Sequence, residues 1–162
     1  IGRGVAKVAQ AFGCRVIYYS TSGRNHNSDY EKVTFDEILQ QSDILSIHAP
    51  LNPATENLMN YNAFRKMKKT SILVNVGRGP IINEADLKRA LDEDLIGGAA
   101  LDVVCREPIT EDNPLNQIKD SSKLIITPHI AWATYEARSR LMKEVYENIQ
   151  SFLAGEKRNV VV

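Results

Sequence analysis

The sequence has few cysteines, no excess of charge of either sign and no long apolar run, and each absence excludes a class of protein. Two cysteines among 162 residues are too few for a disulfide framework, and no spacing typical of metal ligands occurs. Basic and acidic residues number 20 each, so we expect no nucleic-acid or membrane partner. No apolar run approaches the roughly 18 residues that a membrane span requires. We therefore expect a reducing, cytoplasmic setting.

The apolar pattern predicts an α/β fold with one hydrophobic core. Short β-rich apolar runs alternate with segments of helical periodicity, which is typical of helices layered on a parallel sheet. Runs that we predict as strands lie at residues 14–20, 43–50, 71–77, 96–104 and 123–128. Segments that we predict as helices lie at residues 5–12, 62–69 and 83–94, with a short helix beginning at Thr34 and a long one from Thr134 to Gly155. One long irregular stretch, from about Cys105 to Ser122, remains.

Four polar side chains follow predicted strands and should meet at one edge of the sheet. They are His48, Arg78, Asp102 and His129. In a parallel sheet the carboxyl ends of the strands share an edge, and ligands bind in the crevice beyond it. We therefore expect the functional site there.

The first residues, IGRGVA, are similar to the end of a glycine-rich turn that binds dinucleotides, in which a helix N-terminus faces the pyrophosphate. A plain turn before an amphipathic helix is the alternative. The strand and the first two glycines of such a motif are absent, and in this sheet order the absent strand would be central. We therefore expect that the chain is a fragment or a partial record.

Three motifs in order, LVNVGRGPIINEADLKRAL, GGAALDVVCREP and ITPHIAWAT, resemble the nucleotide-binding domain of the D-isomer-specific 2-hydroxyacid dehydrogenases. TPHIAWAT and EARSRLM are similar to the glycerate dehydrogenase (hydroxypyruvate reductase) branch. The resemblance implies a Rossmann-type doubly wound parallel sheet whose first, central strand is absent from this chain. It implies an NAD(P)-binding domain at residues 1–154 that ends in a long helix. Residues 155–162 would return toward a substrate-binding domain that is otherwise absent.

The implied activity is hydride transfer between a nicotinamide dinucleotide and a small D-2-hydroxy acid or 2-oxo acid, with glycerate and hydroxypyruvate as the expected pair. Such an acid presents a planar carboxylate, which the paired donors of a guanidinium match, so Arg78 should grip the substrate. Gly77 and Gly79 would let the backbone approach cofactor and substrate. A salt bridge at the sheet edge is the alternative for Arg78.

By the resemblance, His129 is the proton donor, a role suited to the side chain that titrates nearest to neutral pH. Glu107 would pair with His129, because a nearby carboxylate favours the protonated imidazole and orients the ring. A structural histidine and an ordinary loop glutamate are the alternatives. His26 is expected to be solvated, and His48 either lines the adenine pocket or is a satisfied core histidine. Cys105 is expected to be a buried or half-buried thiol without a role.

The resemblance also implies the residues that contact the cofactor. Asp102 would receive the nicotinamide carboxamide. The other matching positions are Ile1, Gly2, Ser20, Pro50, Thr55, Val76, Gly77 and Ala131. A fingerprint for NAD expects an acidic residue about 20 positions after the glycines, where this chain has the run STSGR at residues 20–24. We expect NAD, with NADP also open because no carboxylate there would repel a 2′-phosphate.

Two questions of assembly and function stay open in the sequence. The family resemblance implies a homodimer joined through the nucleotide-binding domain, and Trp132 and the long final helix are candidates for its interface, although Trp132 could equally roof the active site. The chain also resembles transcriptional corepressors of the same fold, which bind a dinucleotide as a sensor. A binding protein of that kind is therefore the alternative to an enzyme.

Overall fold

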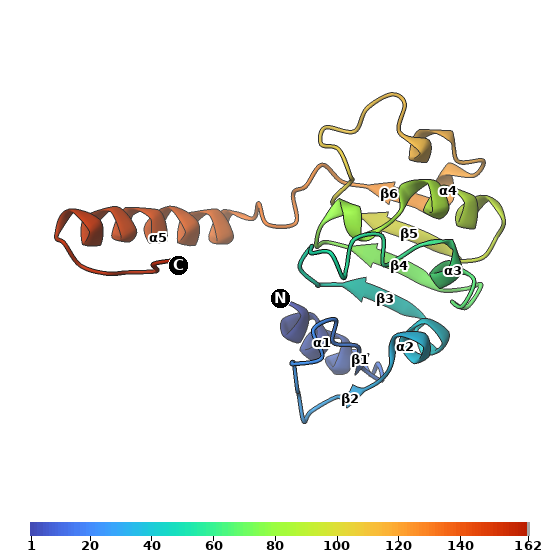
Figure 1. Ribbon diagram of the computed structural model, residues 1–162, viewed down its shortest axis with the longest axis horizontal. Coiled ribbons are helices and arrows are strands. Elements are labelled where there is room, and N and C mark those ends of the chain that lie inside the picture. Colours follow the sequence, from blue (N-terminus) through green and yellow to red (C-terminus); the bar gives the residue numbers. More distant parts are fainter. Residues whose placement is uncertain (162) are drawn as a thin grey trace. The chain divides into compact units, whose positions relative to one another are not determined.

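The computed structural model describes residues 1–161, which form two compact units divided between Pro128 and His129 (Figure 1). The helices are α1 (Gly2–Ala11), α2 (Phe35–Gln41), α3 (Tyr61–Phe64), α4 (Glu84–Asp92) and α5 (Tyr135–Leu153). The strands are β1 (Ile17–Tyr18), β2 (Glu31–Lys32), β3 (Ile44–Ile47), β4 (Ile72–Asn75), β5 (Gly98–Leu101) and β6 (Leu124–Ile126). Three short 3₁₀ turns are η1 (Gly79–Ile81), η2 (Pro114–Gln117) and η3 (Ser121–Lys123). The division into residues 1–154 and 155–162 stays a prediction.

All strands of the described residues pair in parallel, which confirms the α/β class. Strands β3, β4, β5 and β6 form one sheet in that order, and β1 pairs with β2 in a second, two-stranded sheet. Leu45, Leu73 and Ala99 are in register across the larger sheet, and all three are buried. The parallel arrangement places the carboxyl ends of β3 to β6 along one edge (Figure 1).

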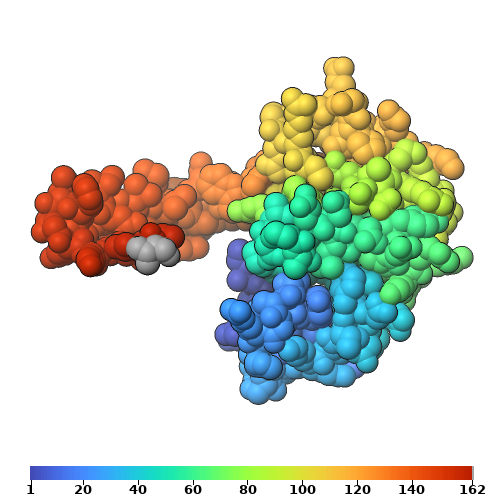
Figure 2. All heavy atoms as spheres, viewed as in Figure 1, coloured from blue at the N-terminus to red at the C-terminus, as the bar shows by residue number. Residues whose placement is uncertain are grey.

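The core lies in the first unit, on the faces of the larger sheet. Its most buried side chains include Leu73 from β4, Phe64 from α3 and Leu87 from α4, none of which is exposed to solvent. Val33 and Leu39, which flank or belong to α2, join the same cluster. Figure 2 shows the blue and cyan atoms of the segment through α2 against the green atoms that follow it. Burial of these side chains stabilises the scaffold by about 25 cal/mol per Å² of apolar surface.

Three helices begin at the residues that the sequence predicts. Thr34 and Glu37 form a capping box, with Thr34 Oγ1 accepting from Glu37 N at 3.2 Å and Glu37 Oε2 accepting from Thr34 N at 2.8 Å. The side chain of Asn83 caps α4 through Asp86 N at 3.0 Å, and Thr134 caps α5 through Ala137 N at 3.2 Å.

Other predictions were wrong in extent. The expected strand at residues 14–20 shrinks to Ile17–Tyr18, because it pairs only with β2, a strand that the sequence did not indicate. The helix expected at 62–69 ends after Phe64, and α1 begins at Gly2 rather than at Val5. No residue of α1 is buried, so in the described chain tertiary packing does little to stabilise that helix.

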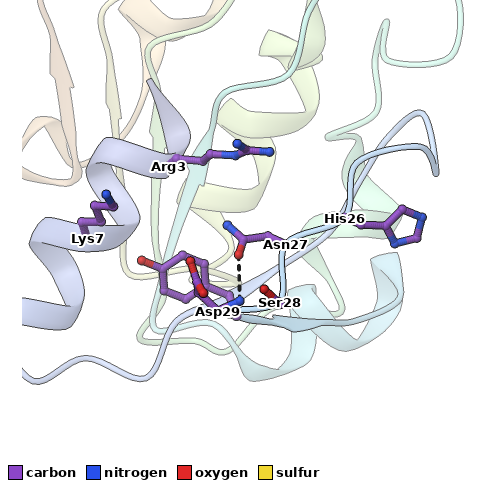
Figure 3. Close-up of a pocket in the computed structure, with 7 residues that line it drawn as sticks. Arg3, Lys7, His26, Asn27, Ser28 and Asp29 are labelled. Atoms are coloured by element: carbon purple, nitrogen blue, oxygen red, sulfur yellow. Dashed lines mark hydrogen bonds between the residues drawn. The ribbon is translucent and has the colours of Figure 1, made fainter.

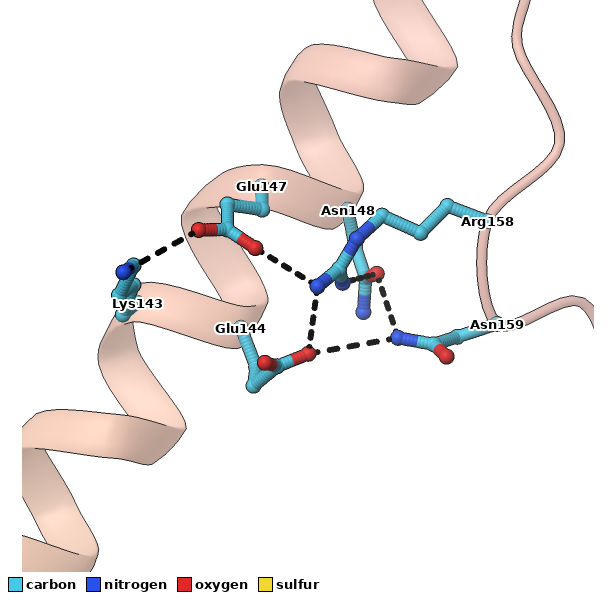
Figure 4. Close-up of polar contacts among 6 residues, drawn as sticks. All are labelled: Lys143, Glu144, Glu147, Asn148, Arg158 and Asn159. Atoms are coloured by element: carbon cyan, nitrogen blue, oxygen red, sulfur yellow. Dashed lines mark hydrogen bonds and ion pairs between the residues drawn. The ribbon is translucent and has the colours of Figure 1, made fainter.

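The second unit is α5 followed by a segment that returns along it. Gly155 has φ +75°, the left-handed conformation that commonly ends a helix. Arg158 then donates through Nη2 to Glu144 at 2.8 Å and to Glu147 at 2.7 Å, and Asn159 Nδ2 donates to Asn148 Oδ1 at 3.0 Å (Figure 4). These bonds hold the segment after Gly155 against the helix.

Within residues 1–161, no helix has the length and apolarity needed to cross a bilayer.

Candidate active site

The loop after β4 presents Arg78 and is held from within by Asn75. Asn75, fully buried, donates through Nδ2 to the carbonyl of Arg78 at 3.0 Å and accepts through Oδ1 from Gly77 N at 3.0 Å. One buried amide therefore forms hydrogen bonds with a backbone carbonyl and a backbone N–H of the tight loop at the carboxyl end of the strand. Sequence reasoning missed Asn75, although a lone amide in the apolar run LVNVG was the signal for it.

The guanidinium of Arg78 faces solvent and makes one polar contact in the part of the chain described, from Nη1 to Gly77 O at 2.8 Å. No ion pair to Arg78 occurs among residues 1–161, so the alternative of a salt bridge at the sheet edge does not hold for this unit. An exposed fork of donors at the end of a parallel strand is suited to a planar oxyanion.

The two glycines that flank Arg78 are crowded by the protein itself. A Cβ on Gly79 would lie 2.1 Å from the backbone carbon and oxygen of Val104, and one on Gly77 would lie 3.2 Å from Ala49 O. The need for glycine at position 79 is therefore close packing of η1 on the segment after β5. This differs from the expected approach to a ligand, which stays a prediction for Gly77.

Asp102 follows β5 and is buried, with 6% of its surface exposed. Its Oδ1 accepts from Thr127 Oγ1, at the end of β6, at 2.5 Å, and its backbone N–H donates to Asn75 O at 2.9 Å. The ends of β4, β5 and β6 are thereby joined at one edge, as expected from the parallel order. The contact of Asp102 with a carboxamide stays a prediction.

Glu107 lies on the irregular segment after β5 and is exposed. Its Oε1 accepts from Val104 N at 3.3 Å. A buried carboxylate that sequence reasoning missed, Glu84, binds the same segment: Oε1 accepts from Cys105 N at 2.7 Å and Oε2 accepts from Asn113 Nδ2 at 2.9 Å. No local signal distinguished Glu84 from an ordinary acidic residue in a first helical turn.

His129 begins the second unit and has φ +53°, a conformation uncommon for residues other than glycine. Its carbonyl accepts from Trp132 Nε1 at 2.8 Å, so the indole of Trp132 closes the turn that leads to α5. Ala131, in the same turn, is exposed. Because the two units are separate bodies, the pairing of Glu107 with His129 stays a prediction.

The start of α1 and the end of β3 approach each other closely. A Cβ on Gly2 would lie 3.3 Å from the ring of His48, so only glycine fits there without displacing the ring. His48 Nε2 is 2.9 Å from Ser46 Oγ, and burial lowers the pKa of His48. A neutral His48 with a partner is unsuited to donate a proton at neutral pH.

The turn after β1 contains residues 20–24, which are expected from the sequence to contact the ribose of the cofactor. Ser20 is buried, with its Oγ accepting from Asn25 N at 3.3 Å, and Gly23 N donates to Ser20 O at 3.0 Å. Lys32 Nζ donates to the carbonyl of Gly23 at 3.1 Å, and Arg24 is exposed. The turn therefore contains the cation Arg24 and no carboxylate, and Lys32 of β2 donates to it.

The remaining expected cofactor residues differ in exposure. Thr55 is fully buried, where its Oγ1 donates to Pro50 O at 2.7 Å and accepts from Asn52 N at 2.9 Å, so it shapes the turn after β3. Ile1 is 96% exposed. Pro50 is exposed, and Val76 is partly exposed. Their cofactor contacts stay predictions.

A cavity of about 320 Å³ lies between α1 and the loop before β2 (Figure 3). It is lined by Arg3, Lys7, His26, Asn27, Ser28, Asp29 and Tyr30. Asn27 Oδ1 accepts from Asp29 N at 2.8 Å and shapes the loop. None of the expected catalytic residues lines this cavity, and His26 is exposed, as predicted.

Cys105 is exposed as a residue, but its thiol is half-buried, as expected from the sequence. Its Sγ lies 3.7 Å from Ile82 O. Burial of the sulfur, followed by the charge of Glu84 and a hydrogen bond to it, raises the pKa of the thiol to about 12. The thiol is therefore protonated at neutral pH and is a poor nucleophile. Among residues 1–161, no cluster of His, Cys, Asp and Glu is placed to hold a metal ion.

Comparison with known proteins finds a matching family model and longer relatives, of which this chain covers about half or less. A family model described as D-isomer specific 2-hydroxyacid dehydrogenase, NAD binding domain, matches residues 1–131. A hydroxypyruvate reductase of Blautia hydrogenotrophica is 44% identical over 99% of this chain and 50% of its own length. A glycerate dehydrogenase of Methylorubrum extorquens is 39% identical over 99% of the chain and 49% of its own length. The crystal structure of D-lactate dehydrogenase with NAD⁺ from Lactobacillus jensenii has a TM-score of 0.89 and 27% identity, covering all of this chain and 52% of that one.

Proposed function

The chain belongs to the D-isomer specific 2-hydroxyacid dehydrogenases as their NAD-binding domain, and we propose that the protein containing it transfers a hydride between a nicotinamide dinucleotide and a small D-2-hydroxy acid or 2-oxo acid. Glycerate and hydroxypyruvate are the first candidate substrates, because two of the relatives described above are named hydroxypyruvate reductase and glycerate dehydrogenase. The chain spans about half the length of these relatives, so the reaction is proposed for the complete protein. No observation favours the alternative of a corepressor-like sensor.

The observation that supports this function best is the exposed guanidinium of Arg78 at the end of β4. Asn75 fixes the backbone on which Arg78 stands, and no carboxylate of the first unit pairs with its charge. A 2-oxo acid brings a planar carboxylate next to the reacting carbonyl, and two parallel N–H donors bind it in one orientation. Arg78 would thus orient the substrate, a contribution that can lower the barrier by several kcal/mol.

His129 would donate the proton that the carbonyl oxygen needs when the carbon accepts a hydride. Its φ of +53° supports this role, because strained backbone is retained most often at functional sites. Glu107 would face the imidazole and favour its protonated form, which is the form required for reduction. In the reverse direction the neutral imidazole would accept the proton of the hydroxyl group.

Two features fit a dinucleotide. Gly2 begins α1, whose first backbone N–H groups would bind the pyrophosphate. Asp102, fixed by Thr127, would accept from the carboxamide at the end of β5. When bound, the dinucleotide supplies or takes up the hydride.

The turn after β1 bears on the choice between NAD and NADP. It offers Ser20 where an NAD fingerprint has an acid, with Arg24 exposed beside it. The matching family model is described as an NAD binding domain, and we propose that this turn also tolerates NADP, because the 2′-phosphate would meet a guanidinium rather than a carboxylate. Ser20→Asp should then reduce use of NADPH selectively.

We further propose a homodimer in the cytoplasm. The dimer is supported by the exposed apolar side chains of α5. They are Tyr135, Leu141, Met142, Val145, Tyr146, Ile149, Phe152 and Leu153. Apolar surface of this kind on one helix is typical of an interface. Sedimentation of the complete protein at micromolar concentration should give a dimer, and a monomer alone would contradict this.

The deciding experiment assays the full-length protein with hydroxypyruvate, glyoxylate and pyruvate, each against NADH and NADPH. We expect turnover, with hydroxypyruvate preferred. Arg78→Lys keeps the charge but loses the fork, so the KM for the 2-oxo acid should rise more than dinucleotide affinity changes. Dinucleotide binding without turnover of any of the three acids would contradict the proposed function.

A further inference from the structure

Two segments of the first unit are joined along a continuous seam, defined here as residues 79–84 and 104–113. Gly79 packs directly under the Val104 backbone, and Cys105 Sγ lies 3.7 Å from Ile82 O. Glu84 then closes the seam with hydrogen bonds to Cys105 N and Asn113 Nδ2. The first segment begins next to Arg78, and the second contains Glu107.

Glu84 is an unusual residue to find at such a place, because only 9% of its surface is exposed. A carboxylate is costly to bury unless its oxygens are hydrogen-bonded. Each oxygen of Glu84 has a donor, at 2.7 and 2.9 Å, and its position in the first turn of α4 adds the favourable end of the helix dipole. The burial is therefore compensated only while both partners stay in place.

The second partner, Asn113, is itself fixed. Asn113 is 6% exposed, and its Oδ1 accepts from Leu115 N at 2.9 Å at the start of η2. Glu84 thus grips both ends of the stretch from Cys105 to Asn113, which contains no α-helix or strand of its own. These two bonds hold the backbone on both sides of Glu107.

We propose that Glu84 is a positioning residue that sets Glu107 relative to Arg78. The inference rests on the catalytic roles proposed above for Arg78 and Glu107. Glu84 touches neither substrate nor cofactor; it acts by holding the backbone of the Glu107 segment against the segment that follows Arg78. The titratable groups of the seam are Glu84, Cys105, Glu107, Glu111 and Asp112, and Arg106 is exposed between Cys105 and Glu107.

The test uses the full-length protein and the variant Glu84→Gln. Glutamine has the same shape but only one acceptor oxygen, so its NH₂ group would face one of the two donors. We expect kcat for hydroxypyruvate reduction to fall about 10- to 100-fold, as a displaced catalytic group would cause, while the Kd for the dinucleotide stays unchanged. The pH above which reduction fails should move lower, in the direction expected for Glu107→Gln. A purely structural role would lower Tm without moving that limit.

Two further variants make the result decisive. Asn113→Ala removes one of the two bonds and should shift kcat and the pH limit in the same direction but by less, which also decides the matter if Glu84→Gln does not fold. Glu93→Gln is the matched control: Glu93 caps α4 and binds Tyr61 and Arg89 away from the seam, so kcat and the pH limit should stay at their wild-type values. Folded Glu84→Gln and Asn113→Ala proteins with wild-type kcat and pH limit would overturn the proposal.

The experiments distinguish an error in the positioning role of Glu84 from an error in the proposed function. If Glu107→Gln itself leaves the pH profile unchanged, the role of Glu107 is wrong, and the positioning proposal falls with it. The contact of Glu84 with the segment at Cys105 is then still measurable through the Cys105 thiol, whose pKa of about 12 depends in part on Glu84. Alkylation of Cys105 at pH 9 should be faster in Glu84→Gln than in the wild type. An unchanged rate would show that Glu84 does not hold this segment in solution.

Discussion

Asn75 Nδ2 donates to the carbonyl of Arg78 at 3.0 Å, so the residue that ends β4 fixes the backbone of the residue proposed to bind substrate. The amide oxygen of Asn75 holds Gly77 in the same loop. A fully buried side chain with this geometry leaves the loop little freedom before a substrate arrives.

Asn75→Asp should therefore damage both stability and substrate binding. The aspartate keeps an acceptor for Gly77 N but loses the donor to Arg78 O, and an unsatisfied buried group costs about 1–3 kcal/mol of unfolding free energy. The KM for hydroxypyruvate should rise in the folded variant. Urea unfolding and steady-state kinetics of the full-length protein measure the two effects. Asn60→Asp is the matched control: it also loses an amide donor, to Asn57 O at 3.3 Å, but at an exposed place, and aspartate is an equally good cap for α3. Its KM should stay unchanged and its stability should change little.

His129→Ala should separate binding from chemistry. The imidazole is proposed to serve the substrate and the proton, so the Kd for the dinucleotide should stay nearly unchanged. Hydroxypyruvate reduction should fall by about 10²–10⁴-fold, the usual contribution of a positioned general acid. Fluorescence titration with NADH and initial-rate assays measure the pair of values. Near-normal turnover in this variant would remove His129 from the mechanism even though the fold is established.

Glu107→Gln should change the pH profile more than the maximal rate. A carboxylate beside the imidazole favours the protonated donor, so its removal makes the donor lose its proton at lower pH. Reduction should then fail at lower pH than in the wild type, with the smallest loss of rate on the acidic side. A profile of kcat from pH 5 to 9 tests this, and an unshifted upper limit would contradict the pairing with His129.

Sequence alone identified those parts of the fold that local chemistry determines. The caps at Thr34, Asn83 and Thr134 bond to backbone groups three residues away, so their signals lie within one turn of sequence. Strand β2 could not be found in this way, because Glu31 and Lys32 are polar and exposed and become a strand only by pairing with β1.

The residues of the candidate site also fall into those that the sequence located and those that it could not. Arg78 and Asp102 were placed at one edge because strand ends are readable from apolar runs, and the structure confirms that their strands are neighbours. The roles of Glu84 and Gly79 were not readable, since each depends on a segment that comes after β5 in the chain. Contacts between distant segments are set by packing, which no single stretch of sequence records.

The Cys105 thiol should resist alkylation although the residue is exposed. A pKa of about 12 means that roughly one thiol in 10⁴ is ionised at pH 8, and only the thiolate reacts. The rate with iodoacetamide should therefore keep rising with pH through pH 10, because the thiolate fraction grows tenfold per pH unit below the pKa. Mass spectrometry of the peptides containing Cys14 and Cys105 gives both rates in one sample. Fast labelling of Cys105 at pH 8 would contradict the effect of burial and Glu84.

Gly79→Ala should be strongly destabilising, because the added methyl group would lie 2.1 Å from the backbone carbon and oxygen of Val104. Backbone atoms of the seam cannot move away by rotation, as the end of a flexible side chain can. The free energy of unfolding should therefore fall by about 3 kcal/mol, the upper end of the range for overpacking. Gly4→Ala is the matched control: nothing lies within 4 Å of the position that its methyl group would take, and Gly4 sits inside α1, where alanine gains about 0.5–1 kcal/mol. Denaturant unfolding of the two full-length variants should give shifts of opposite sign. A Gly79→Ala protein as stable as the wild type would mean that η1 and the segment after β5 are not in contact in solution, and the positioning role of Glu84 would lose its structural basis.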